Sequence, residues 1–270
     1  SEANNKNIPF VLRKGIAYES TIYGGNGSRN FDFDMDIFVK PKNAEEFTEF
    51  MIEIGYQIGK YNDKLDKVEP HPRKDVLIYK LNPDHLLPFS MITGNSLCTH
   101  TCIDVATSFT WFQSDYQVPM EDAFNELVLQ PTLDNKKVNL KVLSPDFQVI
   151  STGLHLFKEA WFERWVDFEQ DVNLLKFCDM IYLWNNHKES LVANDFKKQI
   201  IQLKIEKPIV WVLEHMDRVF NLNSIKTLGL SSFVEEDWLS SGYSSNGKYS
   251  KWEGTMRARL YDKRMRKFTK

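Results

Sequence analysis

The stretch Asn30-Phe31-Asp32-Phe33-Asp34-Met35-Asp36-Ile37-Phe38-Val39 carries an aspartate at every second position from 32 to 36. Side chains alternate between the two faces of a strand, so the pattern predicts a strand with three aspartates on one face and apolar side chains on the other. Like charges on one face repel each other unless something neutralises them. Mg2+ is usually held by one or two carboxylates together with substrate phosphates. The stretch therefore predicts a metal site in a nucleotide-using enzyme, with a solvated acidic edge strand as the alternative.

Composition is that of an ordinary globular protein. The chain has 270 residues, of which 42% are hydrophobic and 26% charged, and this length allows one large domain or two smaller ones. The formal net charge of -3 gives no general basic field that would favour nucleic acid. No apolar run is long enough to span a membrane, and no signal peptide precedes Ile8. We expect a cytoplasmic protein without a membrane partner, and the early first strand leaves room for an upstream domain or a partner protein.

The three cysteines suit a reducing compartment. Their odd number argues against a disulfide framework. Cys98 and Cys102 flank His100, which is an arrangement that zinc uses, but no second convincing pair of ligands accompanies them. Zinc is therefore kept only as a minor alternative.

Strand-like and helix-like segments alternate over about the first 120 residues, which predicts an α/β (α+β) domain over residues 8–125. A Lys14-Gly15 turn separates the first strand from the first helix. The expected strands are 8–12, 33–39, 75–81 and 98–107, and the expected helices are 16–23 and the segment with Phe47, Phe50, Met51 and Ile54 that ends at Gly55.

The second half of the chain reads as a helical domain over residues 140–230. Ser144 is suited to an N-cap and Pro145 to the first helical position, and further helices are expected over 172–184 and 200–220, with an interruption near Pro208. Residues 231–270 form a polar and then basic C-terminal extension. Its basic run predicts either a solvated helix end or a surface for a phosphorylated or nucleic-acid acceptor.

Polymerase-type nucleotidyl transfer uses two metal ions, held by two carboxylates on one strand and usually a third on a neighbouring strand. Ile103-Asp104-Val105 supplies an aspartate between apolar residues and is the candidate for the third carboxylate, with a solvent-facing edge aspartate as the alternative. The turn at Lys14 and Gly15 is placed to offer backbone N–H groups and a positive charge to phosphates, although such a turn is more often a plain loop.

These residues belong to a longer series of motifs that occur in order. Together they resemble the uncharacterised nucleotidyltransferase family, within the polymerase-β-like nucleotidyltransferase superfamily, over about residues 10–190. The motifs are Arg13-Lys14-Gly15-Ile16-Ala17, Tyr23, Arg29, Asp34-Met35-Asp36-Ile37-Phe38-Val39, Gly55-Tyr56, Ile103-Asp104-Val105, Leu143-Ser144-Pro145-Asp146 and the helix from Leu154 to Trp161.

The resemblance implies a small mixed sheet with flanking helices, followed by a helical domain. It also implies transfer of NMP from an NTP with Mg2+ or Mn2+. It selects Asp34 and Asp36 as the metal pair and leaves Asp32 as an extra carboxylate, while Asp104 is kept as the candidate for the third metal ligand. The chain departs from the family pattern after Asp104, where the family often has a His-Trp pair and this sequence has Ala-Thr.

Nucleotide contacts are expected from two further places. Lys14 and Gly15 would position the triphosphate, and the resemblance makes Arg29 a candidate for phosphate contact, with a solvated loop arginine as the alternative. His155 and Lys158 are three residues apart and therefore neighbours on one helix. They are expected to face the nucleotide across a cleft between the two domains, although packing between helices is the commoner role for such a histidine.

The sequence therefore predicts a Mg2+-dependent nucleotidyltransferase that moves NMP from an NTP, with ATP as the expected donor, and releases pyrophosphate. The acceptor is not identified and belongs to one of four classes: a small molecule, a peptide, a protein or a tRNA. Two alternatives are a catalytically silent nucleotide- or partner-binding module of the same fold, and a phosphotransferase that uses the same metal site.

Overall fold

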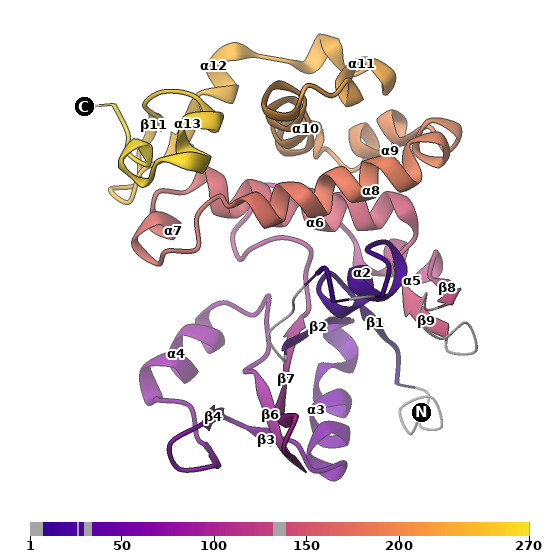
Figure 1. The fold of residues 1–270 in the computed structure, drawn as a ribbon, viewed down its shortest axis with the longest axis vertical. Coiled ribbons are helices and arrows are strands. Elements are labelled where there is room, and N and C mark those ends of the chain that lie inside the picture. Colours follow the sequence, from indigo (N-terminus) through magenta and orange to yellow (C-terminus); the bar gives the residue numbers. More distant parts are fainter. Residues whose placement is uncertain (1–7, 26, 30–33, 132–138, 270) are drawn as a thin grey trace. The chain divides into compact units, whose positions relative to one another are not determined.

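The computed structural model describes residues 8–25, 27–29, 34–131 and 139–269, and it divides into two compact units, Ser1–Ser144 and Pro145–Lys270 (Figure 1). Asp32 and its neighbours from 30 to 33 lie outside the described residues. Within the described part of the chain, every helix is too short or too polar to cross a membrane.

The first unit is built on a mixed sheet, which confirms the predicted fold class. Among the described residues, seven strands pair in the order β3-β6-β7-β2-β1-β9-β8. β2 runs parallel to β7 and β1 runs parallel to β9, whereas the other neighbours are antiparallel. The strands are β1 (Phe10–Leu12), β2 (Asp34–Val39), β3 (Gln57–Ile58), β6 (Phe89–Asn95), β7 (Cys98–Ala106), β8 (Val128–Pro131) and β9 (Asn139–Val142), and a separate hairpin joins β4 (Lys60–Asn62) to β5 (Lys67–Glu69).

One face of this sheet is covered by α3 (Ala44–Glu53), in line with the apolar spacing of that segment. Buried Phe47, Phe50 and Met51 of the helix form one cluster with strand residues that include Ile37 and Val105. Because side chains alternate along a strand, the even-numbered residues of β2 and β7 lie on the opposite face. The other helices of this unit are α2 (Ile16–Thr21), α4 (Arg73–Leu81) and α5 (Met120–Asn125), with a 3-10 turn η1 (Pro41–Asn43).

The strand predicted over 75–81 is wrong, because this segment is the helix α4. Pro72 precedes the helix, and its carbonyl accepts hydrogen bonds from the N–H groups of Asp75 and Val76 at 2.9 and 3.1 Å. A short apolar run does not distinguish a strand from a helix by its periodicity, so the local start signal decides. On the side away from β2, β7 pairs with β6, a strand that the sequence did not reveal.

The second unit is mainly helical. α6 packs against both α8 and α10, and Gly153 of α6 allows the close approach: a Cβ atom there would lie 3.0 Å from Cδ1 of Ile209. The helices are α6 (Pro145–Trp161), α7 (Arg164–Asp167), α8 (Leu174–Ala193), α9 (Phe196–Gln202), α10 (Glu206–Phe220), α11 (Ser224–Thr227), α12 (Glu236–Leu239) and α13 (Met256–Tyr261), with the 3-10 turns η2 (Ser231–Phe233) and η3 (Lys263–Met265) and a hairpin of β10 (Ser241–Tyr243) and β11 (Tyr249–Lys251).

Two expectations about these helices need correction. The interruption predicted near Pro208 occurs before it, at 203–205, and Pro208 lies in the first turn of α10, where a helix needs no N–H donor. The basic run near the end of the chain was expected to be solvated or to face an acceptor. Its residue Arg259 is only 1% exposed and forms an ion pair with Asp171, so the solvated interpretation is wrong for this arginine.

Candidate active site

Three aspartates come together on the face of the sheet that α3 leaves uncovered. Asp36 and Asp104 are direct partners in the parallel register of β2 and β7, and Asp34 precedes Asp36 by two positions on the same strand. Neighbouring strands lie about 4.8 Å apart, and paired residues point to the same side. We call Asp34, Asp36 and Asp104 the carboxylate face. The structure thus places these three predicted residues on one surface.

Lys14 reaches this face from the turn between β1 and α2. Its Nζ lies 2.8 Å from Oδ1 of Asp36, whose side chain is largely buried. Gly15 has φ 48°, a left-handed conformation that glycine adopts without steric cost. Since α2 has only six residues, the charge of Lys14 is the main attraction that this turn offers to phosphates.

Burial and the crowding of negative charge both act on the pKa of Asp34. Burial, and then the charges of Asp36 and Asp104, raise the pKa of Asp34 to about 6. Lys14 and Arg13 act in the opposite direction and are outweighed. Neighbouring protein thus shields the Asp34 carboxyl from part of the solvent, but the residue keeps an exposed surface at the start of β2, so water also screens part of the repulsion. A divalent cation would favour the charged form of all three aspartates.

No ready-made cluster of three metal-binding side chains exists among the described residues. This applies to clusters of His, Cys, Asp and Glu side chains, and the carboxylate face in its present arrangement does not qualify. In that arrangement the ammonium group of Lys14 pairs with one oxygen of Asp36. It also holds for the segment considered for zinc. His100 stacks on the ring of Tyr61 with 4.0 Å between centroids, and Cys98 and Cys102 are free thiols.

Comparison with known proteins assigns the family. Residues 2–221 match a family described as uncharacterised nucleotidyltransferases. The chain belongs to this nucleotidyltransferase family. The resemblance predicted from the motifs is thereby confirmed, and membership supports nucleotidyl transfer as the general activity. No curated protein matched the chain.

Arg13 lies beside the carboxylate face of this nucleotidyltransferase, but the sequence pattern indicated no separate role for it. It belongs to the same motif as Lys14. Its side chain is buried, and its guanidinium carbon lies 4.5 Å from the ring centroid of Phe38, the next residue of β2 that points to the same side as Asp36. Its backbone N–H donates to the carbonyl of Asp36 at 3.0 Å. The signal in the sequence was the pair of adjacent cations directly after the first strand.

Arg29 belongs to a loop that a buried carboxylate holds. Glu19 of α2 accepts hydrogen bonds from the backbone N–H groups of Gly27 at 2.5 Å and Arg29 at 2.6 Å. Glu19 therefore fixes where the backbone of Arg29 lies. The predicted contact of the Arg29 side chain with phosphate stays a prediction.

A histidine that sequence reasoning missed lies on the same side of the sheet. His85 forms an isolated antiparallel bridge with Ala106, which lies two positions beyond Asp104 on β7. The N–H of Thr107 donates to the carbonyl of Asp84 at 2.8 Å and fixes this pairing. Nδ1 of His85 is 3.3 Å from Oδ2 of Asp84. Since bridge partners point to the same side, His85 faces the side of the carboxylates.

Tyr79 of α4 is a second residue that was missed. Burial, and then the charge of Asp104, raise the pKa of the Tyr79 hydroxyl to about 12, with smaller contributions from Asp75, Asp84 and Asp34. The phenol therefore stays protonated and lies in the negative field of the carboxylate face. The incorrect strand prediction for 75–81 concealed it.

His155 and Lys158 lie on α6, in the second unit, where the structure gives both of them partners. Nε2 of His155 is 3.3 Å from Oε2 of Glu159, one turn along the same helix. Nζ of Lys158 lies 5.1 Å from the ring centroid of Trp165. These contacts agree with the packing role considered for His155. The predicted contact of both side chains with the nucleotide stays a prediction.

Proposed function

We propose that this protein is a divalent-metal-dependent nucleotidyltransferase that transfers NMP from an NTP to a hydroxyl-bearing acceptor and releases pyrophosphate. The observation that carries the proposal is the parallel register of β2 and β7, which lines up Asp36 with Asp104 and keeps Asp34 on the same face. Family membership supports the reaction class.

The donor set fits Mg2+ or Mn2+. Both are cations that oxygen ligands bind well, and a cation would counteract the burial and the neighbouring carboxylate charges that raise the pKa of Asp34. Asp34, Asp36 and Asp104 would hold the metal. When bound, the metal supplies positive charge that stabilises the phosphate oxygens as the bond at phosphorus changes.

The cations beside this face would bind the triphosphate. Lys14 now lies against Asp36, and a triphosphate offers its ammonium group a stronger negative partner. Arg13 is held against Phe38 and contributes a fixed positive charge that requires no rearrangement. We assign Lys14 to the phosphates and Arg13 to the electrostatic background of the site. ATP is the proposed donor.

Proton transfer is assigned to His85. A carboxylate that holds a metal is a poor base, whereas an imidazole is the commonest general base in enzymes. With Nδ1–H donating to Asp84, Nε2 of His85 is left to accept the proton of the acceptor hydroxyl. Asp84 is then a positioning residue, since it sets the tautomer of the imidazole.

The experiment follows the phosphorus of ATP. The intact protein is incubated with Mg2+ and ATP labelled either at the α- or at the γ-phosphate, together with hydroxyl metabolites, peptides, proteins or tRNA as acceptors. The proposal expects transfer of the α-label and release of pyrophosphate. Transfer of the γ-label with release of ADP would show a phosphotransferase instead. Absence of both transfer and ATP binding would favour a silent module.

Asp36→Asn tests the site within the same assay. The substitution keeps the size of the side chain and removes its charge, so transfer should fall on the order of a thousandfold. Asp115→Asn is the matched control, because Asp115 is an exposed aspartate of the same unit. It should retain the activity of the unchanged protein. Equal activity in the two variants would remove Asp36 from the mechanism.

A further inference from the structure

A cavity of about 410 Å³ lies in the second unit, lined by residues of α10, α12 and the segment that leads into α13. Its wall includes the apolar side chains of Val219, Leu239, Trp252 and Met256. Most of the lining comes from residues 236–259, beyond residue 221, where the family match ends. The volume lies within the range of about 300–1,000 Å³ found for sites of small molecules.

Arg259 lines this cavity and carries a donor without a partner in the described part of the chain. It is 1% exposed, and its Nη2 donates to Oδ1 of Asp171 and to the carbonyl of Ala160, both at 2.9 Å. Its Nε has no hydrogen-bond partner in the described structure. A buried charged donor without a partner is costly, and a ligand oxygen would remove that cost.

Positive charge is in excess around Arg259. Nε of Arg266 lies 3.7 Å from Oδ2 of Asp171, so two guanidinium groups share one carboxylate. We call Arg259 and Arg266 the arginine pair. Burial lowers the pKa of Arg259 to about 10, Asp171 offsets part of this effect, and the charge of Arg266 adds a smaller lowering. A bound anion would neutralise the positive charge that Asp171 leaves uncompensated.

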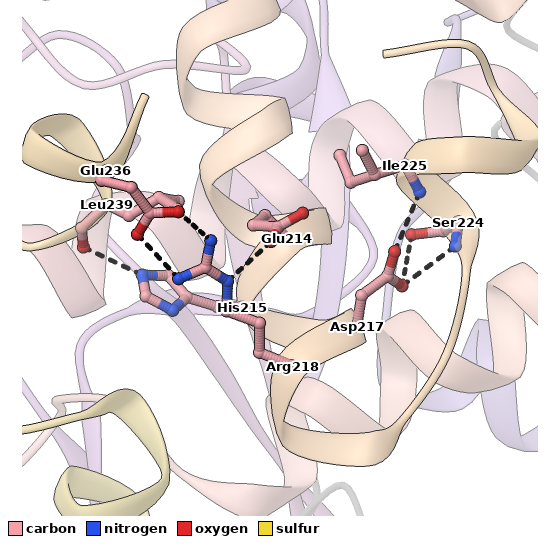
Figure 2. A network of polar contacts seen from close by, with 8 residues as sticks. All are labelled: Glu214, His215, Asp217, Arg218, Ser224, Ile225, Glu236 and Leu239. Carbon is pink, nitrogen blue, oxygen red and sulfur yellow. Dashed lines mark hydrogen bonds and ion pairs between the residues drawn. The ribbon is translucent and has the colours of Figure 1, made fainter. Parts of the chain in front are cut away.

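Arg218 and His215, two further residues of the cavity lining, already have partners (Figure 2). Arg218 donates to Glu214 through Nε at 2.6 Å and to Glu236 through both terminal nitrogens, so it faces two carboxylates. Burial lowers the pKa of His215 to about 3, and the neutral ring donates through Nε2 to the carbonyl of Leu239 at 3.0 Å. Arg257 also lines the cavity, so the excess of positive charge resides with Arg257 and the arginine pair.

The indole ring of Trp252, which lines the cavity, lies beside that charge. The guanidinium carbon of Arg259 is 3.5 Å from the ring centroid of Trp252, which is itself buried. The cavity thus combines an aromatic wall and aliphatic side chains with one hydrogen-bond donor of positive charge. This combination suits a ligand with an apolar body and an anionic end.

We propose that this cavity binds a small organic anion, with a carboxylate or phosphate group at Arg259 and an apolar body against Trp252, Leu239 and Met256. The site belongs to the second unit alone. It does not depend on the proposed nucleotidyl transfer, and failure of either proposal leaves the other intact.

The first test measures thermal stability of the intact protein without divalent metal, in the presence of millimolar phenyl phosphate, benzoate, inorganic phosphate or benzyl alcohol. A ligand that binds only the folded state raises the melting temperature. Phenyl phosphate or benzoate should raise it more than inorganic phosphate does, and the neutral alcohol should not raise it. Asp36→Asn should respond equally, which separates this site from the carboxylate face. No shift with either aromatic anion would overturn the proposal.

A cavity-filling variant gives the second test. Val219→Trp places a large side chain in the lining, and Val192→Trp makes the same change at an exposed position of α8 that does not line the cavity. Val219→Trp should weaken binding of the aromatic anion more than about tenfold, while Val192→Trp should leave it unchanged. Val219→Phe is the milder second variant if the tryptophan variant does not fold. If the Val219 variants bound the aromatic anion as tightly as Val192→Trp does, the anion would bind elsewhere.

Discussion

The two units carry opposite imbalances of charge. In the first unit, three carboxylates share a face with two cations, and Lys14 forms an ion pair with one of the three. In the second unit, the arginine pair shares the single carboxylate of Asp171, which is fully buried. The first imbalance lies on the face of the sheet opposite α3, where Asp34 is exposed and Asp36 is buried, and it is suited to a cation with phosphates. The second is enclosed beside an aromatic wall and is suited to an organic anion.

The same shortage of counter-charge has different consequences in the two surroundings. Water reaches Asp34 and screens the repulsion there, so the first unit tolerates its imbalance in the free protein. Asp171 and Arg259 have no such access, and breaking a buried ion pair leaves an uncompensated charge in a medium of low dielectric constant.

The largest expected effect on stability is therefore in the second unit. Asp171→Asn should lower the free energy of unfolding by about 3–5 kcal/mol, because it leaves the arginine pair without a counter-charge. Asp167→Asn, at an exposed position of α7, is the control and should change it by less than about 0.5 kcal/mol. Urea unfolding of the intact chain measures both. If Asp171→Asn behaved like the control, the buried ion pair would contribute little to the stability of the fold.

The next effect in size concerns proton transfer in the first unit. His85→Gln should lower transfer about a hundredfold and remove the part of the pH profile that rises with deprotonation of the base. Binding of NTP should persist, because the phosphate contacts are assigned to other residues. His71→Gln is the control, since the ring of His71 bonds to the carbonyl of Pro88. A loss of activity without a change in the pH profile would assign His85 a structural role.

The smallest effect is the pH dependence of stability that Asp34 causes. Its pKa in the folded state, about 6, is above the ordinary value of 3.8, so the folded protein binds more protons between these two values. The contribution of Asp34 to the free energy of unfolding must then fall as the pH rises from about 4 to about 6. Asp34→Asn removes this loss, and screening limits the gain at pH 7 to about 1 kcal/mol.

Melting temperatures of both proteins measured from pH 4 to pH 8 test this. The difference between the variant and the unchanged protein should be near zero at the acidic end and should reach its full size above pH 6. A difference that grew as the pH fell would contradict the raised pKa and with it the crowding of the three carboxylates.

The sequence predicted those parts of the fold that depend on local patterns. Alternation identified β2 and β7 and put Asp34 and Asp36 on one face, and helical spacing identified α3 and α6. The register that opposes Asp36 to Asp104 is a pairing between strands far apart in the chain, and no local pattern encodes it. Asp104 was found only because a third carboxylate was sought.

The missed residues depend on tertiary pairing. His85 lies in an irregular segment and becomes a neighbour of the site only through its bridge to Ala106. Tyr79 was concealed because its apolar run suits a strand and a helix equally. Arg259 lies in a basic run that composition alone assigns to the surface, and only the packing of the second unit buries it.

A measurement of metal-dependent nucleotide binding tests whether the carboxylate face holds a divalent cation together with an NTP. The melting temperature of the intact protein is measured with a non-hydrolysable ATP analogue, with and without Mg2+, and again for Asp36→Asn and Asp115→Asn. We expect the analogue to stabilise the unchanged protein and Asp115→Asn much more when Mg2+ is present, and to lose this dependence on Mg2+ in Asp36→Asn. Equal Mg2+-dependent stabilisation of all three proteins would show that Asp36 and the carboxylate face do not hold the metal.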